Sequence, residues 1–258
     1  MKSKILNQIK FSFILLLMLL GFASLHQPAE AHTQRQVTKN PPKKPVKVNR
    51  KRPRGDRRGR PTRRRAVGSR NDCPATDMPL TALIPENQVG KVVEAKPTFW
   101  VFIPYESNRI HKGEFVLQDE AHNNVYRNEF SVEKGKGIVS INLASGNTYT
   151  LKTNKSYQWY FKLYCDGDNS SIPIYVRGWV QRIALEPQQQ TQLSQLRSSR
   201  QRIAFYAENG IWYSALTQSA KLRLSNFQNK SLAKDWMQLL SNMGLQDLSN
   251  QPIVGKIN

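Results

Sequence analysis

Seven short apolar runs, separated at regular intervals by turn-forming clusters, most constrain what this 258-residue chain can fold into. They lie between Pro79 and Leu185, and no helical periodicity separates them. Short strands at regular spacing predict an antiparallel sandwich. We therefore expect a mainly β domain over residues 73–186, an immunoglobulin-like antiparallel β-sandwich. The runs are PLTALIP, PTFWVFIP, GEFVLQDE, NVYRNEFSV, GIVSINL, SYQWYFKLYC and IPIYVRGWVQRIAL.

Aromatic residues recur inside these predicted strands. Tyr157 opens the run YQWYFKLYC and follows Leu151 by six residues, a spacing that resembles the tyrosine corner of immunoglobulin-like sandwiches. Trp100, Trp159 and Trp179 also lie within strand patterns, among apolar neighbours. Exposed on one face, such rings would form a platform for carbohydrate, but their apolar neighbours favour packing in the core.

The composition changes after residue 186, and apolar residues then recur every three or four positions. This spacing predicts a small C-terminal α-helical segment over residues 187–258. We expect Gly210 to end one helix and Ser231 to cap the last. The helices should pack on each other and on the sandwich, and a groove for a partner is the alternative. The inward stripe of the last helix would consist of Trp236, Leu239 and Leu240.

The first 31 residues have the layout of a secretory signal peptide. Three lysines precede an apolar core at Phe11–Leu25, and small residues provide a cleavage pattern between Ala31 and His32. The apolar core is shorter than the ~20 residues of a membrane-spanning helix, although an uncleaved anchor is the alternative. No later segment is apolar enough to span a bilayer. We expect the mature chain to be exported to the periplasm, the cell surface or the exterior.

Export gives the two cysteines a structural interpretation. Cys73 opens the region expected to fold, and Cys165 ends a strongly apolar run. In an oxidising compartment such a pair favours a disulfide, and two buried thiols are the alternative. Neither cysteine has a neighbouring histidine or a C-x-x-C partner that would activate its thiol, so we expect no catalytic role for either.

Residues 32–70 form a basic segment, rich in proline and arginine, that differs sharply from the rest of the chain. They contain sixteen Lys or Arg residues and one acid, Asp56, whereas residues 71–258 contain twenty basic and sixteen acidic residues. The formal net charge of +21 therefore belongs mostly to this segment. We expect a disordered linker, which either attracts the protein to anionic surfaces or only spaces the domain. Its predicted polyanion-binding residues are Arg50, Lys51, Arg52, Arg54, Arg57, Arg58, Arg60, Arg63, Arg64 and Arg65.

The sequence contains no recognisable catalytic or cofactor motif. His111 and His122 flank one predicted strand, which separates them too widely to share a metal ion easily. The run Asp166–Ser171 begins like a calcium loop, but it has Ser171 where such a loop needs glycine and Arg177 where it needs glutamate. We interpret this run as a hairpin turn, and we expect no catalytic residue, cofactor or metal site.

A further set of runs spans about residues 73–258: CPATDMPLTALIPENQVGKVVEAKPTFWVFIPY, GEFVLQDEAHNNVYRNEF, GIVSINL, YQWYFKLYC, GWVQRI and AENGIWYSAL. In combination they resemble an uncharacterised family of exported cyanobacterial proteins, a domain of unknown function. The resemblance implies a location in the envelope or outside the cell. It implies no activity and no functional residue.

Three functional hypotheses follow, and we favour the first. It describes a non-enzymatic, exported envelope protein that binds another protein or a glycan and is positioned by its basic linker. The second is an exported hydrolase of envelope polysaccharide or peptidoglycan, which requires a cleft with clustered carboxylates or histidines. The third is non-specific nucleic-acid binding through the linker, which lacks the stacking aromatics that specific readout requires.

Overall fold

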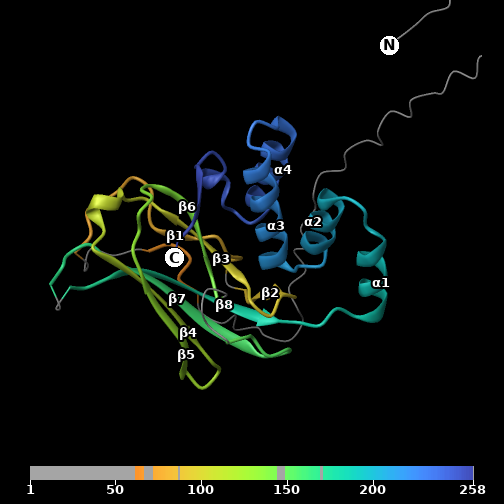
Figure 1. Cartoon of the computed structure of the whole chain (residues 1–258), viewed down its shortest axis with the longest axis horizontal. Helices are drawn as coiled ribbons and strands as arrows, with labels where there is room; N and C mark the ends of the chain where they lie inside the picture. Colours follow the sequence, from red (N-terminus) through yellow and green to blue (C-terminus); the bar gives the residue numbers. More distant parts are fainter. Residues whose placement is uncertain (1–61, 67–71, 87, 144–148, 169–170, 258) are drawn as a thin grey trace, which may run out of the picture. The chain divides into compact units, whose positions relative to one another are not determined.

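The computed structural model describes residues 62–66, 72–86, 88–143, 149–168 and 171–257 (Figure 1). These residues form two β-sheets and a group of helices. The expected signal peptide, its cleavage site at Ala31 and His32, and the linker up to Pro61 lie outside the described residues. No helix in the described ranges has the length and apolarity needed to cross a bilayer.

Nine strands build the two sheets in the described part of the chain. One sheet has the order β2-β8-β7-β4-β5, and the other has the order β1-β3-β6-β9. The five-stranded sheet contains β2 (Gly90–Val92), β8 (Ile174–Arg182), β7 (Ser156–Tyr164), β4 (Lys112–Gln118) and β5 (Asn124–Phe130). The four-stranded sheet contains β1 (Thr81–Ala82), β3 (Thr98–Ile103), β6 (Gly137–Asn142) and β9 (Ile253–Lys256). A 3-10 helix, η1 (Ser107–Arg109), lies between β3 and β4.

Each of the seven predicted runs contains a strand, which confirms the mainly β class. The expectation of a purely antiparallel sandwich is wrong, because β2 pairs with β8 and β6 with β9 in parallel. The sequence pattern did not reveal β2 or β9, and β9 lies in the segment expected to be helical. Both are short, with three and four residues, and each pairs with a strand far away in the sequence.

Side chains from both sheets share one core. On β3, Phe99, Val101 and Ile103 lie in this core together with Phe115 of β4 and Trp159 of β7. The ring centroid of Phe99 lies 4.8 Å from that of Phe115 and 5.2 Å from that of Trp159. Because side chains alternate along a strand, one face of each sheet supplies this interior.

Helices cover the opposite face of the four-stranded sheet, as Figure 1 shows. The intervening β3 residues Trp100 and Phe102 belong to a second apolar cluster, which includes residues of α2, α3 and α4. The indole N–H of Trp100 donates to the hydroxyl of Thr217 on α3 at 3.0 Å. The domain is therefore built of three layers. The helices are α1 (Pro187–Gln195), α2 (Ser199–Glu208), α3 (Trp212–Ser225), α4 (Lys230–Asn242) and the 3-10 helix η2 (Gln246–Leu248).

The helical segment follows the predicted spacing, with one correction to its capping. The side-chain oxygen of Asn229, and not that of Ser231, caps α4 by accepting from the backbone N–H groups of Ser231 and Leu232. Gly210 follows α2 with a φ of +70°, a conformation that favours glycine. A capping box at Ser198 separates α2 from α1. As expected, the buried residues of α4 include Trp236, Leu239 and Leu240.

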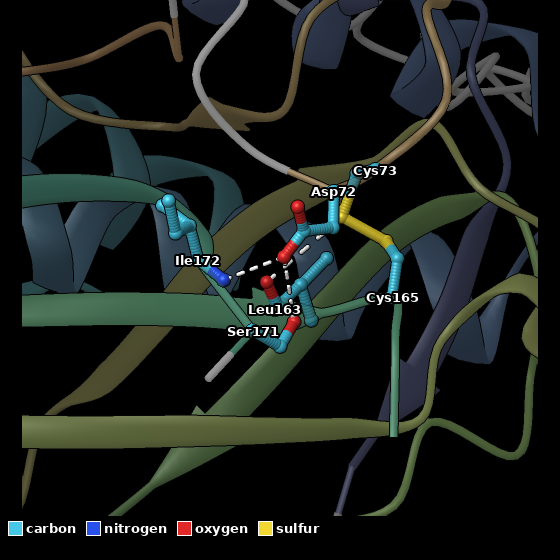
Figure 2. The surroundings of a disulfide bond; sticks show 6 residues. All are labelled: Asp72, Cys73, Leu163, Cys165, Ser171 and Ile172. Atoms are coloured by element: carbon cyan, nitrogen blue, oxygen red, sulfur yellow. Dashed lines mark hydrogen bonds between the residues drawn. A yellow bond between two sulfur atoms is a disulfide. The ribbon is translucent and has the colours of Figure 1, made fainter. Parts of the chain in front are cut away.

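Cys73 and Cys165 form the predicted disulfide (Figure 2). It joins residues 92 positions apart and ties the segment before β1 to the end of β7. In the chain-entropy model a loop of this length stabilises the fold by about 4–5 kcal/mol. Beside it, the Asp72 carboxylate accepts from the backbone N–H of Ile172 at 2.6 Å and from the hydroxyl of Ser171 at 3.0 Å. These contacts fasten the connection of the β7–β8 hairpin to the same segment.

Thr62–Ala66 belong to the domain, although their composition predicts that they are part of the linker. Arg63 exchanges two backbone hydrogen bonds of 3.0 Å with Arg177 of β8. Two more, of 2.7 and 2.9 Å, join the segment to Ala82 and Leu80 at the edge of the four-stranded sheet. The expected linker boundary at residue 70 is therefore wrong. We call Thr62–Ala66 the bridging segment, because it pairs with both sheets.

Side chains of the bridging segment hold the chain that follows α4. Arg64 donates to the carbonyls of Met243 and Gly244 at 2.9 and 3.3 Å, groups that a helix end leaves without helical partners. Arg65 forms a bidentate pair with Asp247 at 2.8 and 2.9 Å, which holds the pKa of Asp247 below its usual value. The domain itself engages both guanidinium groups.

A chain that begins at Thr62 should unfold with the same free energy as the full chain, whereas one that begins at Val67 should be less stable. We expect a loss of about 2–4 kcal/mol, since four backbone hydrogen bonds each contribute roughly 1 kcal/mol. Urea unfolding followed by tryptophan fluorescence compares the three proteins. Equal midpoints for the two truncated chains would contradict the bridging role.

Candidate ligand-binding face

Potential catalytic groups are scattered over the described residues. There, no group of three or more His, Cys, Asp or Glu side chains is placed to hold a metal ion. His111 and His122 lie beyond opposite ends of β4. A hollow of about 410 Å³ beside β5 includes Glu129 and Glu133, but Glu129 is paired with Lys112 at 3.4 Å. The hollow therefore does not offer two free carboxylates.

The three strand tryptophans lie in three different environments. Trp159 lies in the core between the sheets and donates to the hydroxyl of Tyr213 at 2.7 Å. Trp100 lies beneath the helices, so core packing is confirmed for both. Trp179 alternates with the core residue Val180 and therefore lies on the outer side of β8, where it is only 7 % exposed. These three residues do not form a shared platform.

The outer side of the five-stranded sheet carries tyrosines and cations instead. Phe161 and Leu163 of β7 point into the core, so Tyr160, Lys162 and Tyr164 lie on the opposite side. The described helices share an apolar cluster with the four-stranded sheet, and α3 also contacts β2 at the edge of the five-stranded sheet. The strand registers define the outer face as Lys112, Glu114, Val116, Arg127, Glu129, Gln158, Tyr160, Lys162, Tyr164, Tyr175, Arg177 and Trp179.

One row of the outer face crosses four strands. The registers place Arg127 of β5, Val116 of β4, Tyr160 of β7 and Arg177 of β8 side by side. Arg63 of the bridging segment pairs with Arg177 and extends the row. Neighbouring strands are about 4.8 Å apart, so roughly 14 Å separates the backbones of Arg127 and Arg177. We call these five residues the central row: an apolar and aromatic centre with arginines at both ends.

Cations lie over two tyrosine rings beside the central row. The guanidinium of Arg63 lies 4.3 Å from the ring centroid of Tyr175, and the ammonium of Lys112 lies 5.1 Å from that of Tyr164. The rings of Tyr160 and Tyr175 are 6.2 Å apart, centroid to centroid. Cation–π attraction holds such groups together, so the outer face combines aromatic surface with positive charge.

One carboxylate is buried among these cations. The Glu114 side chain is 3 % exposed and accepts hydrogen bonds from Lys162 at 2.8 Å and from Arg127 at 2.9 Å. Burial acts to raise its pKa, but the two hydrogen bonds and charges outweigh burial, and the pKa lies below its usual value. Glu114 is therefore an anion that orients two cations of the outer face, and its lowered pKa does not suit a general acid.

Arg177 differs from these cations because it lacks a partner. Its Nε is buried without a hydrogen bond, and within the described ranges no acceptor or carboxylate pairs with its guanidinium. Including Arg63, the outer face carries five cations against the carboxylates of Glu114 and Glu129. A buried polar group without a partner is costly, so an anion bound at Arg177 would be stabilised.

The predicted polyanion-binding residues are distributed differently from the sequence-based expectation. Arg63 contributes to the outer face, whereas Arg64 and Arg65 are engaged at the end of the helical layer. The outer face was not predicted from the sequence, although alternation in SYQWYFKLYC places Tyr160 and Lys162 opposite the core residues. The other predicted residues, Arg50, Lys51, Arg52, Arg54, Arg57, Arg58 and Arg60, lie outside the described residues.

Replacing Glu114 with glutamine should lower the free energy of unfolding by about 2 kcal/mol at pH 7, because two cations lose a buried charged partner. The lowered pKa means that this stabilisation is present above the ordinary glutamate pKa of 4.5 and is lost as the pH falls through the pKa of the folded protein. The difference between wild type and Glu114→Gln should therefore shrink in acid.

Urea unfolding of both proteins at neutral and acidic pH checks this expectation. Glu129→Gln is the matched control, because its carboxylate belongs to an exposed ion pair on the same strands. A destabilisation by Glu114→Gln that stays constant as the pH falls would contradict the assigned charge state.

Comparison with known proteins places the domain in a family. Residues 63–253 match the family model described as Domain of Unknown Function (DUF928). No curated protein matches the chain. The match begins within the bridging segment and extends to the first residue of β9, so it includes the central row and all four α-helices. The chain therefore belongs to the DUF928 family, a domain of unknown function.

Proposed function

We propose that this protein is an exported, non-enzymatic binding protein of the cell envelope, and that its outer face takes an acidic polysaccharide. The central row carries the proposal, because Tyr160 lies between Arg127 and Arg177. A sugar ring can pack on the tyrosine, while carboxylate or sulfate groups of the polymer accept hydrogen bonds from the arginines. Arg177, which has no partner in the described structure, would gain one.

The predicted export favours a polysaccharide over a nucleic acid as the ligand. A basic face with tyrosines also suits single-stranded nucleic acid, which stacks on aromatic rings. The expected signal peptide would place the protein outside the cytoplasm, where acidic polysaccharide is one of the available polyanions. The disulfide between Cys73 and Cys165 is compatible with such an oxidising compartment.

The basic linker would add a less specific attraction to the same kind of ligand. The chain enters the domain through Thr62 and Arg63, and Arg63 belongs to the central row. The predicted polyanion-binding residues from Arg50 to Arg60 precede this segment in the sequence. We propose that they hold the protein near anionic surfaces, an effect that salt screens.

We also propose that the sandwich is a variant of the immunoglobulin-like type. The hydroxyl of Tyr157 accepts from the backbone N–H of Lys152 at 3.0 Å, which supports the tyrosine corner inferred from the sequence. The parallel strands β2 and β9 would then be additions to the antiparallel framework.

Arg177→Gln and Tyr160→Ala should each weaken binding to polygalacturonate about tenfold, since each removes a contact to the polymer. The measurement is isothermal titration at about 0.15 M salt, where long-range attraction is largely screened. All variants are made in a chain beginning at Thr62, so that the basic linker does not contribute. Arg197→Gln, an exposed arginine between α1 and α2, is the matched control and should bind as wild type does.

Two further measurements distinguish this function from the alternatives. Polygalacturonate binding that neither variant weakens, or single-stranded DNA that displaces the polymer from wild type, would overturn the assignment of the ligand. Release of new reducing ends from polygalacturonate or peptidoglycan would contradict the non-enzymatic role.

A further inference from the structure

Two large apolar side chains are exposed at the turn that joins α3 to α4. Leu224, in the last turn of α3, is 43 % exposed, and Phe227 in the connecting turn is 75 % exposed. Figure 1 shows the two helices side by side, with this turn at the end of the pair away from the sheets. Most other large apolar residues of the described structure are buried. We call residues 221–230 the helical tip.

Neither of these two side chains belongs to an apolar cluster of the fold. The buried residues of α3 end at Ala220, and those of α4 begin at Leu232, so the helical tip extends beyond the apolar cluster. Polar groups hold the turn instead: the Asn226 amide donates to the carbonyl of Leu222, and Asn229 caps α4. Packing within the described domain therefore does not account for the exposure of Phe227, and an exposed apolar group of this kind can mark a binding surface.

Cations surround the exposed pair. Lys221 and Arg223 lie in the last turns of α3, and Lys230 and Lys234 lie in the first turns of α4. Residues 209–234 contain no acidic side chain. Within the described structure none of the four cations is in an ion pair, and Asp235, which follows them, is paired with Arg200. The helical tip thus combines exposed apolar groups with a positive charge of +3, and Lys234 adds a fourth cation just beyond it.

We propose that the helical tip docks onto an anionic lipid surface. Phe227 and Leu224 would enter the boundary between headgroups and acyl chains, where apolar groups leave water. The lysines would keep their charges among the lipid phosphates while their alkyl chains lie along the apolar side chains. An acidic protein partner could meet the charges, but two exposed apolar side chains on a projecting turn suit a fluid surface better than a fixed one. This site is separate from the outer face and does not depend on the proposed function.

Vesicle binding by the full chain tests the proposal, with the basic linker present in every variant so that its attraction cancels. The vesicles contain phosphatidylglycerol and phosphatidylcholine in equal parts. Phe227→Ser should weaken partitioning about tenfold, since an aromatic side chain loses its burial. Lys230→Gln and Lys234→Gln should each weaken it about fivefold on these vesicles and have no effect on pure phosphatidylcholine. Ile172→Ser, at an apolar side chain that is 53 % exposed elsewhere, is the matched control.

Depth-dependent quenching separates insertion of the tip from attraction of the linker. In Phe227→Trp the added fluorescence should be quenched by lipids with brominated acyl chains, whereas in Ile172→Trp it should not. Equal quenching in the two variants would overturn the proposal, as would wild-type partitioning by Phe227→Ser. The proposal would also be overturned if Phe227→Ser abolished binding to an acidic protein and left vesicle binding unchanged. That result would assign the helical tip to a protein partner.

Discussion

Strand β3 is buried on both faces, and the three layers of the domain depend on it. Every side chain from Phe99 to Ile103 is at most 2 % exposed. Phe99, Val101 and Ile103 fill the sandwich, while Trp100 and Phe102 fill the space beneath the helices. A slip of one residue would exchange the two sets, so the register of β3 against β6 is strongly determined. The four-stranded sheet is therefore fixed from both sides.

The five-stranded sheet has a different role, because the core needs only one of its faces. Its inward residues, such as Phe115 and Trp159, meet β3, while the residues that alternate with them along the same strands remain available for other interactions. The outer face can therefore carry charges and tyrosines without disturbing the interior. A charged residue that is buried on this face is more constrained: Glu114 needs both of its cationic partners.

Local patterns in the sequence predicted the parts of this fold that depend on local physics. The alternation of apolar residues and the turn-forming clusters were enough to predict a strand in each of the seven runs. The expected export was enough to predict the disulfide between Cys73 and Cys165. The parallel strands β2 and β9 were missed because their partners lie far away along the chain. The central row also depends on the pairing of β4 with β7, two strands that are distant in the sequence, so Val116 and Tyr160 could not be placed beside each other from the sequence alone.

The bridging segment was missed for another reason: its composition is that of a disordered chain. The arginines of TRRRA suggest repulsion and solvation, yet backbone hydrogen bonds require no apolar side chain. The groups that accept hydrogen bonds from Arg64 and Arg65 lie about 180 residues later, at Met243, Gly244 and Asp247. Charge composition therefore predicts disorder only where no distant acceptor is supplied by the fold.

The order of attachments along the N-terminal segment also determines how the domain would bear mechanical load. A pull on the chain before Thr62 first meets the paired backbone of Arg63, at the boundary between the two sheets. If those hydrogen bonds yield, the load passes to Cys73, whose covalent bond to Cys165 transfers it directly to the end of β7. Extension from this end therefore stops at Cys73, ten residues after Arg63. A protein held at a surface by its basic segment would stretch at its attachment while its core stays folded.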